Sequence, residues 1–190
     1  MTDRVVIPFE ERPETIRGRA AELAISRWLQ QRGWRVLPAY DYAGQGERKA
    51  PKLEAIPATA SLVVPDLVAV RAGNARWCEV KWKQRADFTR ITGRLETGIA
   101  ARLWEHYRNV RVVSGLEVHL LFVHADEDEV RGAELAYLDG GRCNHGPHQD
   151  TPIKRVYHGG KMGRSGMVFF CWHCLASYAR TSIIMAEASA

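Results

Sequence analysis

Three residues, Asp66, Glu79 and Lys81, are of the types that can together hold a divalent metal and activate water. Asp66 follows a proline inside the apolar run 62–70, where a charge is costly to bury without a partner. Glu79 and Lys81 are two positions apart, so on a strand their side chains share one face. Carboxylate oxygens suit hard ions such as Mg²⁺ or Mn²⁺, and a nearby ammonium can hold water and offset phosphate charge.

A hairpin would bring these three residues together. Residues 61–70 and 76–83 are predicted to be strands, and residues 72–74 between them fit a hairpin turn. A turn centred there places Asp66 across from residues 79–81. Two carboxylates held close together repel, so they need a cation, which a lysine supplies in part and a divalent metal more fully. The alternative is an ordinary cross-strand salt bridge on a solvated face.

The elements around the hairpin predict an α/β fold. Apolar residues at helical spacing predict helices over residues 15–31 and 94–110. Apolar runs predict further strands over residues 34–42 and 117–124. The order is therefore helix, three strands, helix, strand, which predicts a mixed central sheet flanked by helices.

Length and composition fit one globular domain with an appendage. The chain has 190 residues, of which 46% are hydrophobic and 26% charged, enough to bury a core without disulfides. We expect residues 1–139 to form the core, with the acidic stretch 126–139 at its surface, and residues 140–190 to form a C-terminal extension packed on it. No apolar run is long enough to cross a membrane, and the polar N-terminus does not resemble a signal peptide. We therefore expect a cytoplasmic protein with reduced cysteines and no membrane partner.

Positive charge is concentrated around the predicted site. The formal net charge is +5, and residues 71–111 hold ten Lys or Arg against four acids. A basic segment around a candidate site favours a polyanionic partner such as a nucleic acid. The alternative is a solvated surface that happens to be rich in arginine, and charge alone does not decide between the two.

Pro65-Asp66, followed after twelve residues by Glu79-Val80-Lys81, resembles the signature of the PD-(D/E)xK nuclease superfamily. That superfamily includes restriction endonucleases, Holliday junction resolvases and phage or repair exonucleases, and its core has the element order predicted above. The resemblance covers residues 15–124. It implies a restriction-endonuclease-like α/β fold and a nuclease that hydrolyses phosphodiester bonds in DNA with Mg²⁺ or Mn²⁺, with RNA left open as a substrate.

The same resemblance implies roles for individual residues. Asp66 and Glu79 would ligate the metal, the backbone carbonyl of Val80 would complete its shell, and Lys81 would orient or activate water. Glu22 matches an acidic position on the family's preceding helix, where it would bind a second metal or organise its waters. The alternative for Glu22 is a pair with a polar neighbour on its own helix.

Three further residues, Lys83, Gln84 and Arg102, are candidates for contact with nucleic acid. Lys83 and Gln84 would reach the scissile phosphate region, and Arg102 on the second helix would touch the nucleic-acid backbone; solvent exposure is the alternative for each. Many members of the family act as dimers, so a homodimer is compatible with the resemblance. A non-catalytic nucleic-acid-binding module with the same fold is the alternative function, although the complete set of two acids and a lysine argues against it.

The segment 140–190 contains a second group of chemically active residues. A Cys-x-His pair and a Cys-x-x-Cys pair could supply four tetrahedral ligands to Zn²⁺, with another nearby histidine as an alternative nitrogen ligand. The four residues are Cys143, His145, Cys171 and Cys174. The other interpretation is two buried thiols in a strand and scattered surface histidines. If the cluster is the chain's main feature, the protein is a zinc-stabilised interaction protein.

Overall fold

The computed structural model describes residues 11–39, 52–53, 62–159 and 166–189. Within these residues, a six-stranded sheet has the order β1-β4-β5-β8-β9-β12. Its strands are β1 (Arg35–Pro38), β4 (Leu67–Arg71), β5 (Asn74–Lys83), β8 (Glu117–His124), β9 (Glu129–Glu134) and β12 (Ala176–Ala179). β5 and β8 are parallel and the other neighbouring pairs are antiparallel, so the sheet is mixed as expected.

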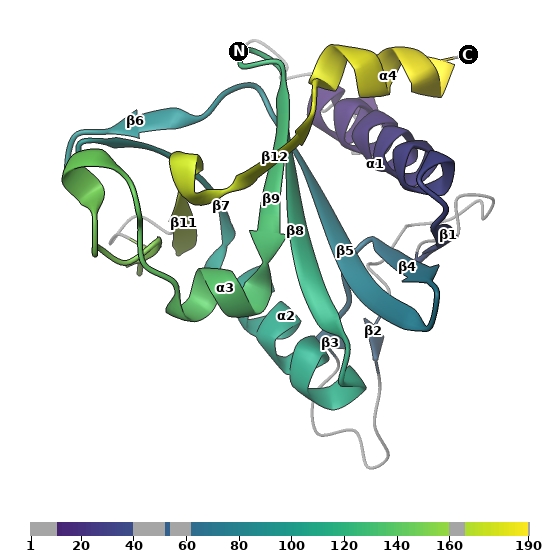
Figure 1. The fold of residues 1–190 in the computed structure, drawn as a ribbon, viewed down its shortest axis with the longest axis horizontal. Coiled ribbons are helices and arrows are strands. Elements are labelled where there is room, and N and C mark those ends of the chain that lie inside the picture. The colour runs from purple at the N-terminus through teal and green to yellow at the C-terminus, as the bar shows by residue number, and fades with distance from the viewer. Residues whose placement is uncertain (1–10, 40–51, 54–61, 160–165, 190) are drawn as a thin grey trace, which may run out of the picture.

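Helices lie on both faces of this sheet. Figure 1 shows α4 lying against α1 on one side, while α2, α3 and a second sheet occupy the other. The helices are α1 (Pro13–Gln31), α2 (Ala101–Ser114), α3 (Leu135–Gly140) and α4 (Thr181–Ser189). In the described part of the chain, no helix has the length and apolar character needed to cross a membrane.

The second sheet has four strands in the order β10-β11-β7-β6. They are β6 (Asp87–Thr89), β7 (Arg94–Ala100), β10 (Lys154–Tyr157) and β11 (Met167–Cys171). The smaller elements are the ribbon of β2 (Lys52–Leu53) and β3 (Leu62–Val63) and the short 3-10 helices η2 (Gly146–His148) and η3 (Trp172–Cys174). Residues on both sides of position 140 therefore build both sheets, and the domain division at 139/140 stays a prediction.

Two apolar cores lie on opposite faces of the central sheet because side chains alternate along its strands. One core joins α1 and α4 to the face that carries Val80 and Leu121. The other joins α2 to the face that carries Leu120 and Phe122, and it continues into the second sheet. Tyr107 of α2 is 2% exposed in this second core. β5 is thus anchored between two cores, which makes it a rigid support for side chains at its end.

The predicted helix over residues 94–110 is wrong in its first seven positions. Residues 94–100 form β7, and α2 begins at Ala101. Leu95 and Ile99 have helical spacing, but together with Thr97 they also alternate as in a strand. β7 pairs with β6 on one side and with the distant β11 on the other, and this pairing decides in favour of the strand.

The expectation that residues 126–139 lie at the surface is wrong for part of this stretch. This stretch contains β9 and α3, and Val130, Leu135 and Leu138 are all 1% exposed or less. The acids between these apolar residues suggested a solvated surface, but β9 and α3 each bury one side. Burial also extends to the C-terminus, where Ile184 of α4 is fully buried against α1.

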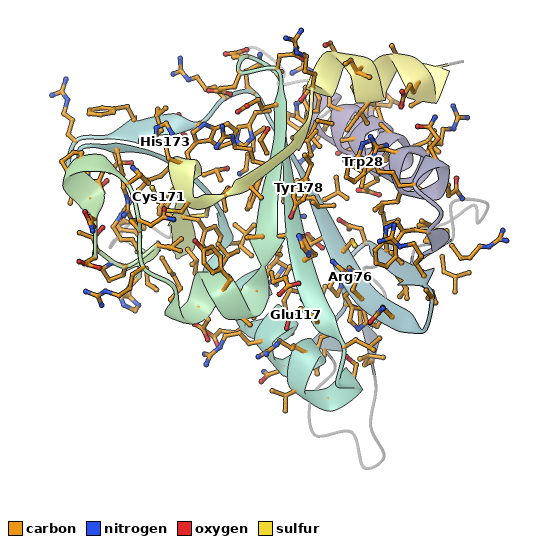
Figure 2. The ribbon with its side chains drawn as sticks, viewed as in Figure 1. Trp28, Arg76, Glu117, Cys171, His173 and Tyr178 are labelled. Carbon is orange, nitrogen blue, oxygen red and sulfur yellow. The ribbon has the colours of Figure 1, made fainter. Side chains whose placement is uncertain are left out.

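His119 of β8 is a buried histidine whose ring contacts side chains of β5 and β12. Its Nε2 lies 2.7 Å from the Tyr178 hydroxyl and its Nδ1 3.4 Å from Nη1 of Arg76, both labelled in Figure 2. Burial, helped by the positive charge of Arg76, lowers the pKa of His119 from 6.5 to about 4. The unfolded chain therefore takes up a proton between pH 6.5 and 4 that the folded chain does not, so stability falls as the pH drops through this window.

We expect His119→Gln to weaken this pH dependence, because glutamine keeps hydrogen-bonding capacity but does not titrate. The measurement is the urea unfolding midpoint of the wild type and the variant between pH 7 and 4. His158→Gln, at an exposed position, is the control and should leave the profile unchanged. Parallel profiles for the wild type and His119→Gln would show that His119 is not a source of acid sensitivity.

Candidate active site

Asp66 is held against β5 through both its main chain and its side chain. The residue is 4% exposed, and its Oδ2 accepts the N–H of Val80 at 2.8 Å. Its backbone carbonyl accepts the N–H of Ala39 at 2.8 Å, just beyond β1. The pairing of β4 with β5 begins at Leu67 and Cys78. Val80 lies beyond this ladder, so its N–H donates to the Asp66 carboxylate instead of to a carbonyl of β4.

The turn predicted at residues 72–74 is confirmed and sets this register. Arg71 pairs with Asn74, leaving Ala72 and Gly73 as a two-residue turn with φ of 48° and 78°. Positive φ at both central positions matches the twist of the two strands. The predicted strand 61–70 is wrong in one respect, since residues 64–66 separate β3 from β4. Proline 65 has no N–H to donate to a ladder, and the break releases Asp66 to point its carboxylate at β5.

Glu79 is the second buried carboxylate, and one of its oxygens lacks a hydrogen-bond partner in the described part of the chain. It is 1% exposed and lies on the face of β5 opposite Val80. Its Oε1 forms an ion pair with Nζ of Lys81, whose side chain is 31% exposed. Oε2 has no hydrogen-bond partner among the residues that the structure describes. A buried carboxylate oxygen without a partner is unfavourable, and a hard divalent cation would satisfy it; the residues present therefore fit such an ion.

The electrostatics of the cluster favour an added cation. Burial raises the pKa of Asp66 well above its ordinary value of 3.8, and the negative charge of Glu79 raises it further. The charge of Lys81 and the Val80 N–H act in the opposite direction, and Glu22 adds a smaller upward contribution. Two buried carboxylates with one lysine are under-compensated, an arrangement that is frequent at functional sites.

Glu22 approaches the cluster from α1. It lines a pocket of about 380 Å³ together with Ser26, Pro38 and Leu67, the residue that follows Asp66. The pocket therefore connects the helix to the start of β4. Its lining is compatible both with a role toward the metal and with a pair on its own helix, so the role of Glu22 stays a prediction.

Lys83, one of the three candidates for nucleic-acid contact, lies on the same face of β5 as Glu79 and Lys81. Burial and the neighbouring charge of Lys81 lower the pKa of Lys83 below 10.5, while Asp87 acts in the opposite direction. Gln84 is exposed and its amide donates to Oδ1 of Asp126. Arg102 is exposed in the first turn of α2. Contact of these residues with nucleic acid stays a prediction.

The predicted Cys/His group is assembled in the structure. One ligand atom from each of its four residues lies within 4.8 Å of every other. The four are Cys143, His145, Cys171 and Cys174. The rings of His148 and His173 lie beside that of His145, with centroids 5.9 and 5.2 Å away, and Figure 2 shows His173 near Cys171. The structure therefore selects His145 as the histidine of the group.

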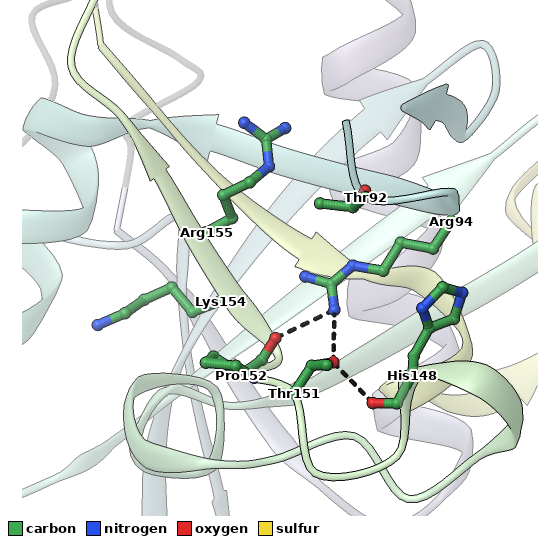
Figure 3. Close-up of a pocket in the computed structure, with 7 residues that line it drawn as sticks. All are labelled: Thr92, Arg94, His148, Thr151, Pro152, Lys154 and Arg155. Atoms are coloured by element: carbon green, nitrogen blue, oxygen red, sulfur yellow. Dashed lines mark hydrogen bonds between the residues drawn. The ribbon is translucent and has the colours of Figure 1, made fainter. Parts of the chain in front are cut away.

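Sequence reasoning missed a basic pocket of about 260 Å³ beside this group, drawn in Figure 3. Its lining residues are Thr92, Arg94, His148, Thr151, Pro152, Lys154 and Arg155. Arg94 and Arg155 both pair with Glu96, which is 1% exposed. In a strand, Arg94 and Glu96 lie on the same face, and this spacing was the signal for an ion pair here. The prediction of a helix for this segment concealed it.

Comparisons with known proteins give similarity at the level of solved structures. No protein-family model matches the sequence, and none of the curated proteins matches it. The Holliday junction resolvase Hjc of the archaeal hyperthermophile Archaeoglobus fulgidus is 12% identical with a TM-score of 0.48, over 88% of this chain and 99% of that chain. A nuclease from a fusselovirus is 12% identical with a TM-score of 0.43, over 98% of this chain and 95% of that chain.

Proposed function

We propose that this chain belongs to the PD-(D/E)xK superfamily and hydrolyses phosphodiester bonds in DNA with Mg²⁺ or Mn²⁺ held by Asp66 and Glu79. The observation that carries the proposal is a pair of interacting carboxylates, 4% and 1% exposed, beside β5 just before β4 begins. One Glu79 oxygen has no hydrogen-bond partner in the described part of the chain. A divalent cation would turn this costly arrangement into a favourable one.

The main chain of Val80 supplies the third ligand in this proposal. In a strand, the N–H and C=O of one residue point to the same side. The Val80 N–H points to Asp66, so its carbonyl lies on the same edge of β5. When bound, the divalent ion supplies Lewis acidity toward a phosphate oxygen and neutralises charge on the phosphate. The two carboxylates and the carbonyl fix where that phosphate is attacked.

Lys81 positions the attacking water in this proposal. Its ammonium pairs with buried Glu79, yet the side chain is 31% exposed, so it reaches from the cluster to solvent. An ammonium has three N–H donors, and a pair with Glu79 is compatible with a further bond to water or to a phosphate oxygen. The positive charge also offsets the negative charge that develops on phosphorus during attack. Lys83, on the same face, contributes charge toward the phosphate backbone.

A cleavage assay with a panel of substrates tests the proposal. The full chain is incubated with supercoiled plasmid, linear duplex, a four-way DNA junction and single-stranded RNA, each in Mg²⁺, Mn²⁺ or EDTA. We expect cleavage of at least one DNA substrate with either ion and none in EDTA. Binding of DNA without cleavage in both metals would contradict the proposal and favour a non-catalytic module. Cleavage of RNA alone would contradict the assignment of DNA as the substrate.

Lys83→Ala should weaken DNA binding mainly through lost electrostatics. Loss of one phosphate contact lowers the slope of log K against log salt by about one. The measurement is DNA affinity at several salt concentrations in EDTA, where no turnover occurs. Arg35→Ala, at an exposed position of edge strand β1, removes the same charge and should leave the slope unchanged. Equal slopes for Lys83→Ala and the wild type would show that Lys83 does not contact the DNA backbone.

A further inference from the structure

We propose that Cys143, His145, Cys171 and Cys174 bind one structural Zn²⁺ ion. The proposal is independent of the nuclease function, since the two groups of residues share no member. Three sulfurs and one imidazole nitrogen are the ligands that select Zn²⁺, whereas the oxygens of Asp66 and Glu79 suit harder ions.

The geometry of the four atoms is close to that of a zinc site. In a tetrahedron with Zn–S of about 2.3 Å, neighbouring sulfurs lie roughly 3.8 Å apart. The four ligand atoms lie within 4.8 Å of one another, and Nε2 of His145 is already 3.2 Å from Sγ of Cys171. Small side-chain rotations, closing the widest separation by about 1 Å, would complete the coordination.

The main chain that carries the ligands is fixed by hydrogen bonds on both sides of the group. Cys171 ends β11, and its N–H donates to the carbonyl of Ile153 at 3.0 Å. Cys174 ends η3, one short turn later. Cys143 exchanges main-chain bonds with the loop that follows it, donating to Thr151 at 2.8 Å and accepting from Asp150 at 2.9 Å. The Cys-x-x-Cys pair is thus presented by a strand end, and the Cys-x-His pair by an ordered loop.

Charge around the group also matches a bound zinc ion. Three thiolates and a neutral imidazole around Zn²⁺ carry a net charge of minus one. Arg94 is 6% exposed, and its Nη1 donates to Sγ of Cys143 at 3.3 Å. Arg94 and Arg155 share the single carboxylate of Glu96, so this neighbouring cluster has a net charge of plus one. The net negative charge of the zinc site and the net positive charge of the arginine cluster are adjacent, as expected for residues that hydrogen-bond to the ligands of a metal–thiolate site.

The segment 141–153 explains why a metal is needed here. Of its thirteen residues, Cys143 and Ile153 are the two that are buried. Such a segment has little apolar surface to fix its path, and a metal can take the place of a missing core. The segment also forms one wall of the pocket in Figure 3, where Arg94 donates to Thr151 and Pro152. Because the protein fills all four coordination positions, the site is structural rather than catalytic.

Metal content of the purified chain tests the proposal. We expect about one Zn²⁺ per chain without added metal, falling to near zero in Cys171→Ser. Cys78→Ala is the matched control, because Cys78 is also buried but lies in the other core, and it should keep its zinc. Glu79→Gln should keep it as well, which separates this site from the proposed nuclease site. Equal zinc in Cys171→Ser and Cys78→Ala would overturn the assignment.

Cobalt substitution of the wild type gives a second test that does not depend on a variant folding. Co²⁺ in a tetrahedral thiolate site gives intense visible bands and sulfur-to-metal charge transfer in the near ultraviolet. We expect both in the Co²⁺-loaded full chain, and a stronger charge-transfer band in His145→Cys, which adds a fourth thiolate. A folded wild-type chain that takes up neither Zn²⁺ nor Co²⁺ at these thiols would overturn the proposal.

Discussion

Glu79→Gln is expected to lower Mg²⁺-dependent DNA cleavage by about a thousandfold or more. Glutamine keeps the size of a side chain that is 1% exposed, but it removes the charge that holds the ion together with Asp66. A catalytic metal contributes several kcal/mol of transition-state stabilisation, and about 1.4 kcal/mol corresponds to a factor of ten in rate. The measurement is the single-turnover rate of cleavage of an end-labelled DNA in Mg²⁺.

The same variant should fold at least as well as the wild type when no divalent ion is present. Glu79 raises the pKa of Asp66, which means that the two charges oppose each other in the folded chain. Mg²⁺ at one hundred times its Kd should stabilise the wild type by about 2.7 kcal/mol and Glu79→Gln far less. Glu117→Gln, an acid of β8 paired with Arg111, is the control and should respond to Mg²⁺ as the wild type does. Wild-type cleavage by Glu79→Gln would disprove its role.

Lys81→Ala is expected to slow the chemical step by roughly 10²–10⁴-fold while leaving DNA affinity nearly unchanged. This is the usual contribution of a group that handles a proton or orients the attacking water. The rate at saturating DNA and the DNA concentration at half-maximal rate separate the two effects. Lys83→Ala is the matched control on the same face of β5, and it should alter affinity rather than the saturated rate.

Without metal, Lys81→Ala should lower the stability of the folded chain, whereas Glu79→Gln should not. Lys81 is the ion-pair partner of Glu79, and its charge also lowers the pKa of Asp66. Its removal leaves two buried carboxylates with less compensation, so the variant should be less stable than the wild type in EDTA. It should then gain more than the wild type from added Mg²⁺. Equal, small effects of Lys81→Ala and Lys83→Ala on rate would contradict the roles proposed for both residues.

The hairpin that carries Asp66, Glu79 and Lys81 could be predicted because its determinants are local. The alternating residues of β5 indicate which side chains share a face. The turn at Ala72 and Gly73 then fixes the register, and with it the position of Asp66 beside Glu79 and Val80 of β5. The hydrogen bond from Val80 to Asp66 is the contact that this register implies. What the sequence left open was the burial of both acids, which depends on elements that pack over them.

The errors fall where distant segments decide the structure. The predicted helix over residues 94–110 separates Arg94 from Glu96, whereas both lie on one face of β7. There Arg155 of β10, 59 residues from Glu96, completes a buried ion-pair cluster. The sequence offered no local signal for the burial of Ile184, which comes from packing against α1 near the opposite end of the chain. Such pairings cannot be read from a local period, because the period of β7 fits a helix and a strand equally well.

Binding of Mn²⁺ to the full chain tests the central claim most directly, because free Mn²⁺ can be followed by its electron paramagnetic resonance signal. We predict that the wild type binds Mn²⁺ with a stoichiometry of about one, and that DNA cleavage rises over the same Mn²⁺ concentrations. The double variant Asp66→Asn/Glu79→Gln should show neither, while its zinc content is unchanged. Equal Mn²⁺ binding by the wild type and the double variant, or cleavage of DNA by the wild type in EDTA, would contradict a metal-dependent nuclease site at these two carboxylates.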